Sequence, residues 1–118
     1  MISNKELSNN LFDYLYDNYN LNVNMLNVQI SEEEKNVICK NFYFLLPFIY
    51  RDMSKRQQEI ITLTYGYNKK QTDIAKMLNI SQSNVSIHLN AAYCIINRYF
   101  EIIYRSTIFA LRYEKRKD

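Results

Sequence analysis

Glycine and proline are almost absent from this chain of 118 residues, which has one of each, at Gly66 and Pro47. Sandwiches, barrels and doubly wound sheets need many tight turns, which these two residues usually supply. Their scarcity argues against those architectures and favours helices joined by connections rich in asparagine and serine. The sequence therefore predicts an all-α fold.

Cysteine, histidine and long apolar runs are also scarce. Cys39 and Cys94 lack metal-ligand spacing and are expected to be buried free thiols. With one histidine, no glycine-rich loop and no paired acids on a common face, we expect no enzymatic activity, no metal and no cofactor. No apolar run reaches the roughly 18 residues of a membrane span and no signal peptide is evident. We expect a cytoplasmic protein without membrane contact. It would be bacterial or, if a phage encodes it, located in the cytoplasm of the phage's host.

Charge is distributed unevenly along the chain. Residues 1–53 carry four basic and seven acidic side chains, and residues 54–118 carry eleven basic and five acidic ones, which gives net charges of −3 and +6. A basic C-terminal half is typical of nucleic-acid binding, although a solvated basic face leaves the same pattern.

Two helices are expected in the acidic half. Apolar residues at helical spacing predict the first over residues 5–19, followed by a loop in the asparagine-rich stretch 18–27. Ser31 and Glu34 can form a capping box that begins the second helix. Because proline lacks an amide hydrogen, Pro47 is expected to kink or end that helix.

Further helices are expected in the basic half. Ser54 can cap a helix that ends at Gly66, a second spans about 71–78, and Ser81 can cap a third that nothing breaks before Arg112. Apolar residues recur along the last helix at steps of three and four, as in a heptad seam that includes Ile96, Tyr99, Ile103 and Ala110. We expect this long helix to pack on the N-terminal helices, or to form a dimer through the seam.

Residues 71–92 fit a helix-turn-helix. Ala75 is small enough for two helices to approach closely, Asn79-Ile80-Ser81 can turn the chain, and Ile80 can fill the space between the helices. At about 100° per residue, one face of the second helix is apolar and the opposite face carries short polar side chains and one isoleucine. The N-terminal residues of such a helix meet base edges in the major groove, where Gln, Asn, Ser and Ile can all contact bases. The expected base-reading residues are Gln82, Ser83, Asn84, Ser86, Ile87 and Asn90.

The sequence of residues 54–92 resembles region 4 of bacterial sigma-70-type sigma factors. The matching motifs are S-K-R-Q-Q-E-I-I-T-L-T-Y and, after it, K-K-Q-T-D-I-A-K-M-L-N-I-S-Q-S-N-V-S. The resemblance implies that the second helix enters the major groove of a promoter element and that the domain docks on RNA polymerase. It also implies phosphate contacts at the start of the first helix. The expected phosphate-contacting residues are Lys69, Lys70, Gln71, Thr72 and Lys76.

The expected reading helix departs from sigma factors in one respect, because no Lys or Arg occurs between Met77 and Asn97. DNA affinity comes mostly from phosphate neutralisation. We therefore expect a DNA-binding transcription regulator that needs a second source of affinity, either a homodimer or RNA polymerase. The alternative is a protein-interaction module of the kind found in signal-recognition-particle-associated proteins with a sigma-like helix-turn-helix, in which DNA contact is secondary.

Three segments are expected. Residues 1–53 form an acidic helical part that faces a partner or completes the core, residues 54–92 form the helix-turn-helix domain, and residues 93–118 continue the long helix into a basic tail.

Overall fold

The structure is a computed structural model that describes residues 2–23 and 29–116. In that part of the chain every regular element is a helix. The elements are α1 (Asn4–Val23), α2 (Glu32–Arg51), α3 (Lys55–Ile61), the short π-helix η2 (Thr62–Gly66), α4 (Gln71–Leu78) and α5 (Gln82–Arg116). The predicted all-α class, with a long C-terminal helix packed on the N-terminal helices, is confirmed.

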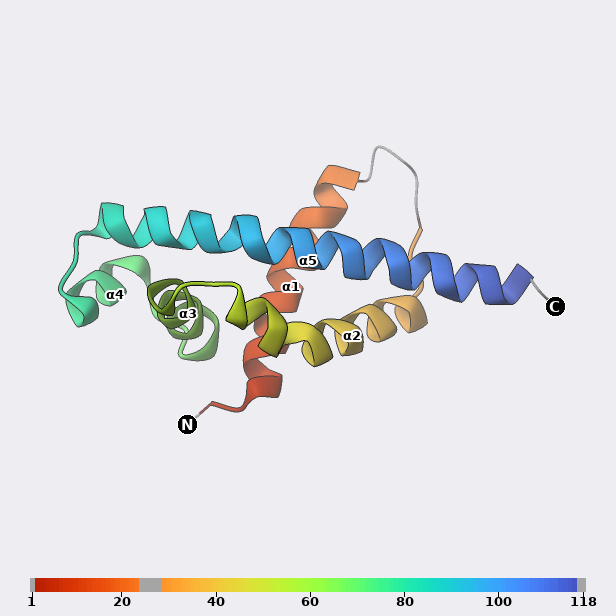
Figure 1. Ribbon diagram of the computed structural model, residues 1–118, viewed down its shortest axis with the longest axis horizontal. Helices are drawn as coiled ribbons and strands as arrows, with labels where there is room; N and C mark the ends of the chain where they lie inside the picture. Colours follow the sequence, from red (N-terminus) through yellow and green to blue (C-terminus); the bar gives the residue numbers. More distant parts are fainter. Residues whose placement is uncertain (1, 24–28, 117–118) are drawn as a thin grey trace.

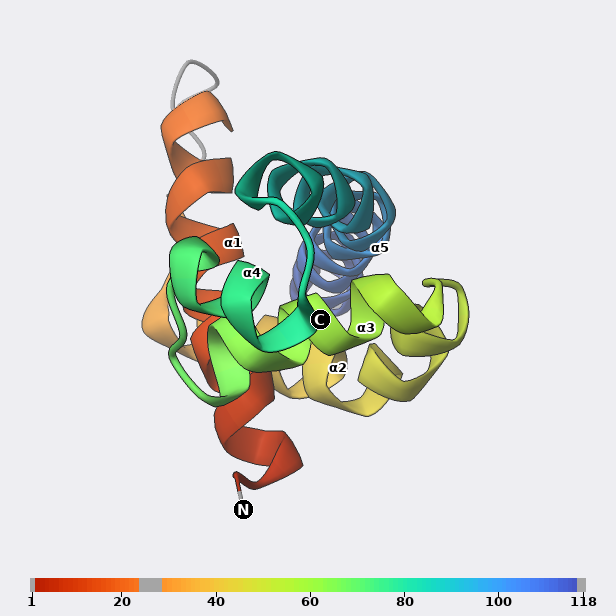
Figure 2. The same cartoon turned by 90° about the vertical axis from the view of Figure 1, so that its left-hand side faces the viewer.

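Helix α5 organises the molecule. It runs nearly the full length of the longest axis, which measures 57 Å, with α3 and α4 beside its first turns and α2 beside its middle (Figure 1). Helix α1 crosses α5 and also contacts α2 and η2, as the end-on view shows (Figure 2). One apolar core joins all the helices, so the expected three segments share a single interior.

The centre of that core is a cluster of three phenylalanine rings from three helices. Phe12 of α1, Phe42 of α2 and Phe100 of α5 are almost fully buried, and their ring centroids lie 5.8–6.1 Å apart. Tilted and edge-on contacts at this spacing are favourable for aromatic rings. The cluster fixes α1 and α2 on one side of α5.

The predicted capping box of α2 and the predicted serine cap of α3 are both present. Ser31 Oγ accepts a hydrogen bond from the Glu34 amide at 3.1 Å, and the Glu34 carboxylate accepts one from the Ser31 amide at 3.0 Å. Ser54 and Gln57 form the same reciprocal pair at the start of α3. The starts of α2 and α3 are therefore determined by local sequence.

The predicted end of α1 was wrong, and of the two alternatives at Pro47 the end of the helix is excluded. Helix α1 continues to Val23, and the rest of the expected loop, residues 24–27, lies outside the described residues. Helix α2 does not end at Pro47 but continues to Arg51. Burial of Leu46 and Ile49 on either side of the proline holds this last turn against the core and offsets the missing backbone hydrogen bond.

The helical segment that begins at Lys55 ends at Gly66, as predicted, because η2 continues α3 to this residue. Gly66 has no positive φ, and the left-handed residue after η2 is Asn68, with φ 55°. A Cβ on Gly66 would lie 3.2 Å from Ile2 Cγ2. Glycine therefore leaves room here for the close approach of the N-terminal segment, and a larger residue would require Ile2 to move by a few tenths of an ångström.

Of the two alternatives expected for the seam of α5, the structure shows packing on the N-terminal helices, whereas the cysteines differ from expectation. Ile96 and Ile103 of the expected seam lie in the protein's own core, Tyr99 is half-buried and Ala110 is exposed. Cys39 is half-buried and Cys94 is exposed, so the expectation that both thiols are buried was wrong.

Candidate nucleic-acid interface

Helix α4, the turn after it and the first turns of α5 form a helix-turn-helix. Asn79 adopts left-handed geometry, with φ 55° and ψ 46°, and the Ile80 amide donates to the Ala75 carbonyl at 3.0 Å. Ser81 Oγ then accepts from the Asn84 amide at 3.1 Å, which begins α5. The chain thus reverses within three residues because asparagine tolerates the left-handed region and serine caps the next helix.

Apolar contacts hold the two helices together. Ile74 and Ala75 of α4 and Val85 and Leu89 of α5 are buried, and the half-buried Ile80 packs against the same core. The predicted roles of Ala75 and Ile80 agree with this packing. The opposite face of α5 is consequently directed away from the protein.

The expected base-reading residues all lie in the first turns of α5, and most of them face solvent. Gln82, Ser83, Asn84 and Asn90 are exposed and Ser86 is half-buried. Ile87 is 63 % exposed although it is a large apolar side chain. His88 is half-buried at the edge of the face.

The expected phosphate-contacting residues lie on α4 and the loop before it. Lys69, Lys70, Thr72 and Lys76 are exposed and Gln71 is half-buried. Lys70 is the N-cap of α4, and its side chain makes no capping hydrogen bond to that first turn. Free amides and lysines at a helix start favour an anion.

A tyrosine cluster fastens α1 to the helix-turn-helix. Tyr14 of α1 packs against Tyr65 of η2 and Tyr93 of α5, with ring centroids 5.7 and 5.4 Å away. The two latter phenols hydrogen-bond each other, and Asn10 Nδ2 donates to the Tyr65 carbonyl at 2.8 Å. Burial raises the pKa of Tyr65 to about 12 and also raises the pKa of Tyr93. Sequence reasoning missed this cluster because its members are distant in sequence.

Two further exposed side chains near the interface were not expected. Tyr67, in the loop before α4, is 46 % exposed, and Met77 of α4 is 55 % exposed. Helical spacing could have placed Met77 on the outer face of α4, whereas Tyr67 lies in a loop without periodicity.

Residues 49–93 match the family model for sigma-70 region 4. This segment is a sigma-70 region 4-like helix-turn-helix. It comprises the end of α2, α3, η2, α4 and the first third of α5. Region 4 is a DNA-binding, regulatory type of domain associated with transcription. Searches of curated proteins and of solved structures found no significant match.

The region 4-like segment is embedded in a larger helical body, because α1, most of α2 and the rest of α5 lie outside the match. Within the described residues, no helix has the length and apolar character of a membrane span. The same part of the chain contains no cluster of three potential metal ligands.

Proposed function

We propose that this protein is a sequence-specific DNA-binding transcription regulator that reads a promoter element with residues 82–90. The observation that carries the proposal is the outer face of α5, where uncharged polar side chains surround the exposed Ile87 within a region 4-like helix-turn-helix. Gln82, Asn84 and Asn90 can pair with adenine edges, the serines can pair with several bases, and Ile87 can contact a thymine methyl.

Phosphate contacts come from outside the reading helix. Lys69, Lys70 and Lys76 are exposed on α4 and the loop before it and supply the electrostatic attraction, with Gln71 and Thr72 at the start of α4. Residue 112, where the basic tail begins, lies about 45 Å along α5 from Gln82.

A second copy of the chain is the proposed second source of affinity. Ile96 and Ile103 are buried in the core, so a dimer would use the exposed side of the C-terminal half of α5. There Ile102 is 66 %, Phe109 70 % and Tyr113 55 % exposed. Large apolar side chains spaced by seven and four residues form one stripe on a helix.

A parallel pair of α5 helices crossing near Phe109 suits one DNA site. The reading residues lie about 35 Å from that crossing point along each helix. At the commonest helix crossing angle of about 50°, the two reading ends would lie about 30 Å apart. One turn of DNA separates half-sites by about 34 Å, so such a dimer would fit a near-palindromic site.

Binding-site selection followed by fluorescence anisotropy tests base reading. Ile87→Lys is expected to change the selected sequence, and Lys70→Ala is expected to weaken binding to all sequences about equally. Lys40→Ala, an exposed lysine of α2, is the control and should leave affinity unchanged. If neither α5 nor α4 substitution alters binding, the helix-turn-helix does not read DNA.

Sedimentation tests the dimer separately. The protein is expected to sediment as a dimer at micromolar concentration and as a monomer after Ile102→Ser and Phe109→Ser. A monomer at high concentration would rule out the dimer and leave RNA polymerase, which the region 4 match favours, as the second source of affinity. Co-purification of polymerase subunits after nuclease treatment would then identify that partner.

A further inference from the structure

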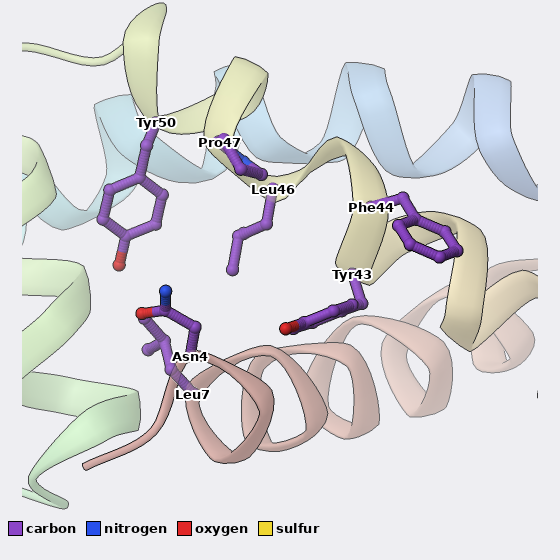
Figure 3. A pocket seen from close by; sticks show the side chains of 7 residues that line it. All are labelled: Asn4, Leu7, Tyr43, Phe44, Leu46, Pro47 and Tyr50. Atoms are coloured by element: carbon purple, nitrogen blue, oxygen red, sulfur yellow. The ribbon is translucent and has the colours of Figure 1, made fainter.

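A pocket of about 480 Å³ lies between the start of α1 and the second half of α2. In the described part of the chain its walls are Asn4, Leu7, Tyr43, Phe44, Leu46, Pro47 and Tyr50. Figure 3 shows Tyr43, Leu46 and Tyr50 directed from α2 toward Asn4 and Leu7. The volume is within the usual range for small-molecule sites.

The chemistry of the walls selects a neutral, flat and apolar molecule. None of these lining residues carries a charge, and most of the surface consists of aromatic, leucine and proline side chains. The polar groups are the Asn4 amide and two phenols. The Tyr50 phenol already hydrogen-bonds Thr62 Oγ1 at 2.9 Å.

Pro47 adds a hydrogen-bond acceptor to this site. In an α-helix the amide of residue 47 would donate to the carbonyl of Tyr43, but proline has no amide hydrogen. The Tyr43 carbonyl therefore lacks its usual helical donor, on a residue that lines the pocket. A bound molecule with an N–H or O–H group would supply the missing donor.

We propose that this pocket binds a small uncharged aromatic molecule that donates a hydrogen bond to the Tyr43 carbonyl. The pocket lies outside the reading face, so binding of a small molecule to it can be measured in the absence of DNA. Tyr50 connects it to the region 4-like segment, because the Tyr50 phenol contacts Thr62 of η2 and its carbonyl accepts from Gln58 Nε2 of α3 at 2.7 Å. A molecule that contacts Tyr50 is therefore expected to perturb η2 and α3, which precede the helix-turn-helix.

Indole and benzofuran form a matched pair of probes, because they have the same shape and only indole has an N–H donor. In spectra of leucine-methyl-labelled protein, indole is expected to shift the Leu7 and Leu46 signals, with a dissociation constant on the order of a millimolar. Benzofuran should bind roughly fivefold more weakly, the effect of one net hydrogen bond. The Thr62 amide should shift with indole, and Tyr50→Phe should remove that shift.

Two substitutions at the start of α1 provide a control for the location. Asn4→Trp places a large ring in the pocket and should weaken indole binding at least about tenfold. Lys5→Trp adds the same ring at the neighbouring exposed position, outside the pocket lining, and should leave binding unchanged. Pro47→Ala restores an amide opposite the Tyr43 carbonyl and should abolish the preference for indole over benzofuran.

Several outcomes would overturn the proposal. These are unshifted Leu7 and Leu46 signals, equal effects of the two tryptophan substitutions, or equal affinities for the two probes. If the same signals shift with protein concentration in the absence of a probe, the pocket is instead occupied by a second copy.

Discussion

Glu34 shows how one buried side chain makes stability depend on pH. Its carboxylate accepts hydrogen bonds from Arg112 Nε at 3.1 Å and from the Ser31 amide, and these contacts lower its pKa below the ordinary 4.5. A lowered folded-state pKa contributes stability that is present above pH 4.5 and is lost as pH falls through the folded value.

Glu34→Gln is expected to reduce the free energy of unfolding at pH 7 by about 1 kcal/mol, since glutamine keeps the capping box but loses the charge. Denaturant titrations at several pH values should show this difference vanishing below about pH 3. Glu33→Gln, at the neighbouring exposed position in the same turn, is the control and is expected to have little effect. A difference that persists undiminished at pH 3 would contradict the assignment.

Asn79 adopts the left-handed backbone conformation on which the turn of the helix-turn-helix depends. Because its φ is 55°, Asn79→Val should cost about 1–2 kcal/mol of stability, whereas Asn79→Gly should cost nothing or stabilise slightly. Thermal unfolding of the two variants measures the contrast. Equal destabilisation by both would mean that the asparagine side chain, rather than the backbone, matters here.

At the scale of helices, capping and periodicity predicted most of this structure. Ser31, Ser54 and Ser81 begin helices as expected, because a cap is a local hydrogen bond. The sequence did not predict which side of α5 would be buried, because this helix has two apolar stripes. One, with Ile96 and Phe100, lies in the core, while the other, with Ile102 and Phe109, is exposed, and only the partner helices decide between them.

The same limit applies to the functional residues. The reading face could be derived from residue spacing because it depends on one helix and its turn. The pocket and the tyrosine cluster combine residues from two or three helices, so their formation depends on the relative positions of α1, α2 and η2. No sequence period encodes those positions.

Replacing Pro47 tests the stability of a single helix, because α2 continues past this proline without a full set of backbone hydrogen bonds. Pro47→Ala supplies the missing amide and is expected to raise the free energy of unfolding by up to about 3 kcal/mol. Urea denaturation measures the change, with Phe48→Ala at the neighbouring exposed position as a control for surface effects. A loss of stability would show that the ring of Pro47 packs too well to be replaced.

For the whole molecule, the salt dependence of DNA binding reports how many copies bind. The three lysines Lys69, Lys70 and Lys76 predict a log–log slope of affinity against salt near −3 for a monomer and about twice that for a dimer. Anisotropy titrations between 50 and 200 mM salt should therefore give the steeper slope for the native chain. Ile102→Ser with Phe109→Ser should return it to the monomer value, whereas Phe48→Ser should not. A slope unaffected by the α5 substitutions would place the dimer contact elsewhere.

The length of α5 also decides where the protein can be labelled. The N-terminal segment lies against Gly66, close to the helix-turn-helix, whereas the C-terminal end of α5 is at the far end of the molecule from the reading residues (Figure 1). A fluorophore or purification handle at the C-terminus would thus be about 50 Å from Gln82.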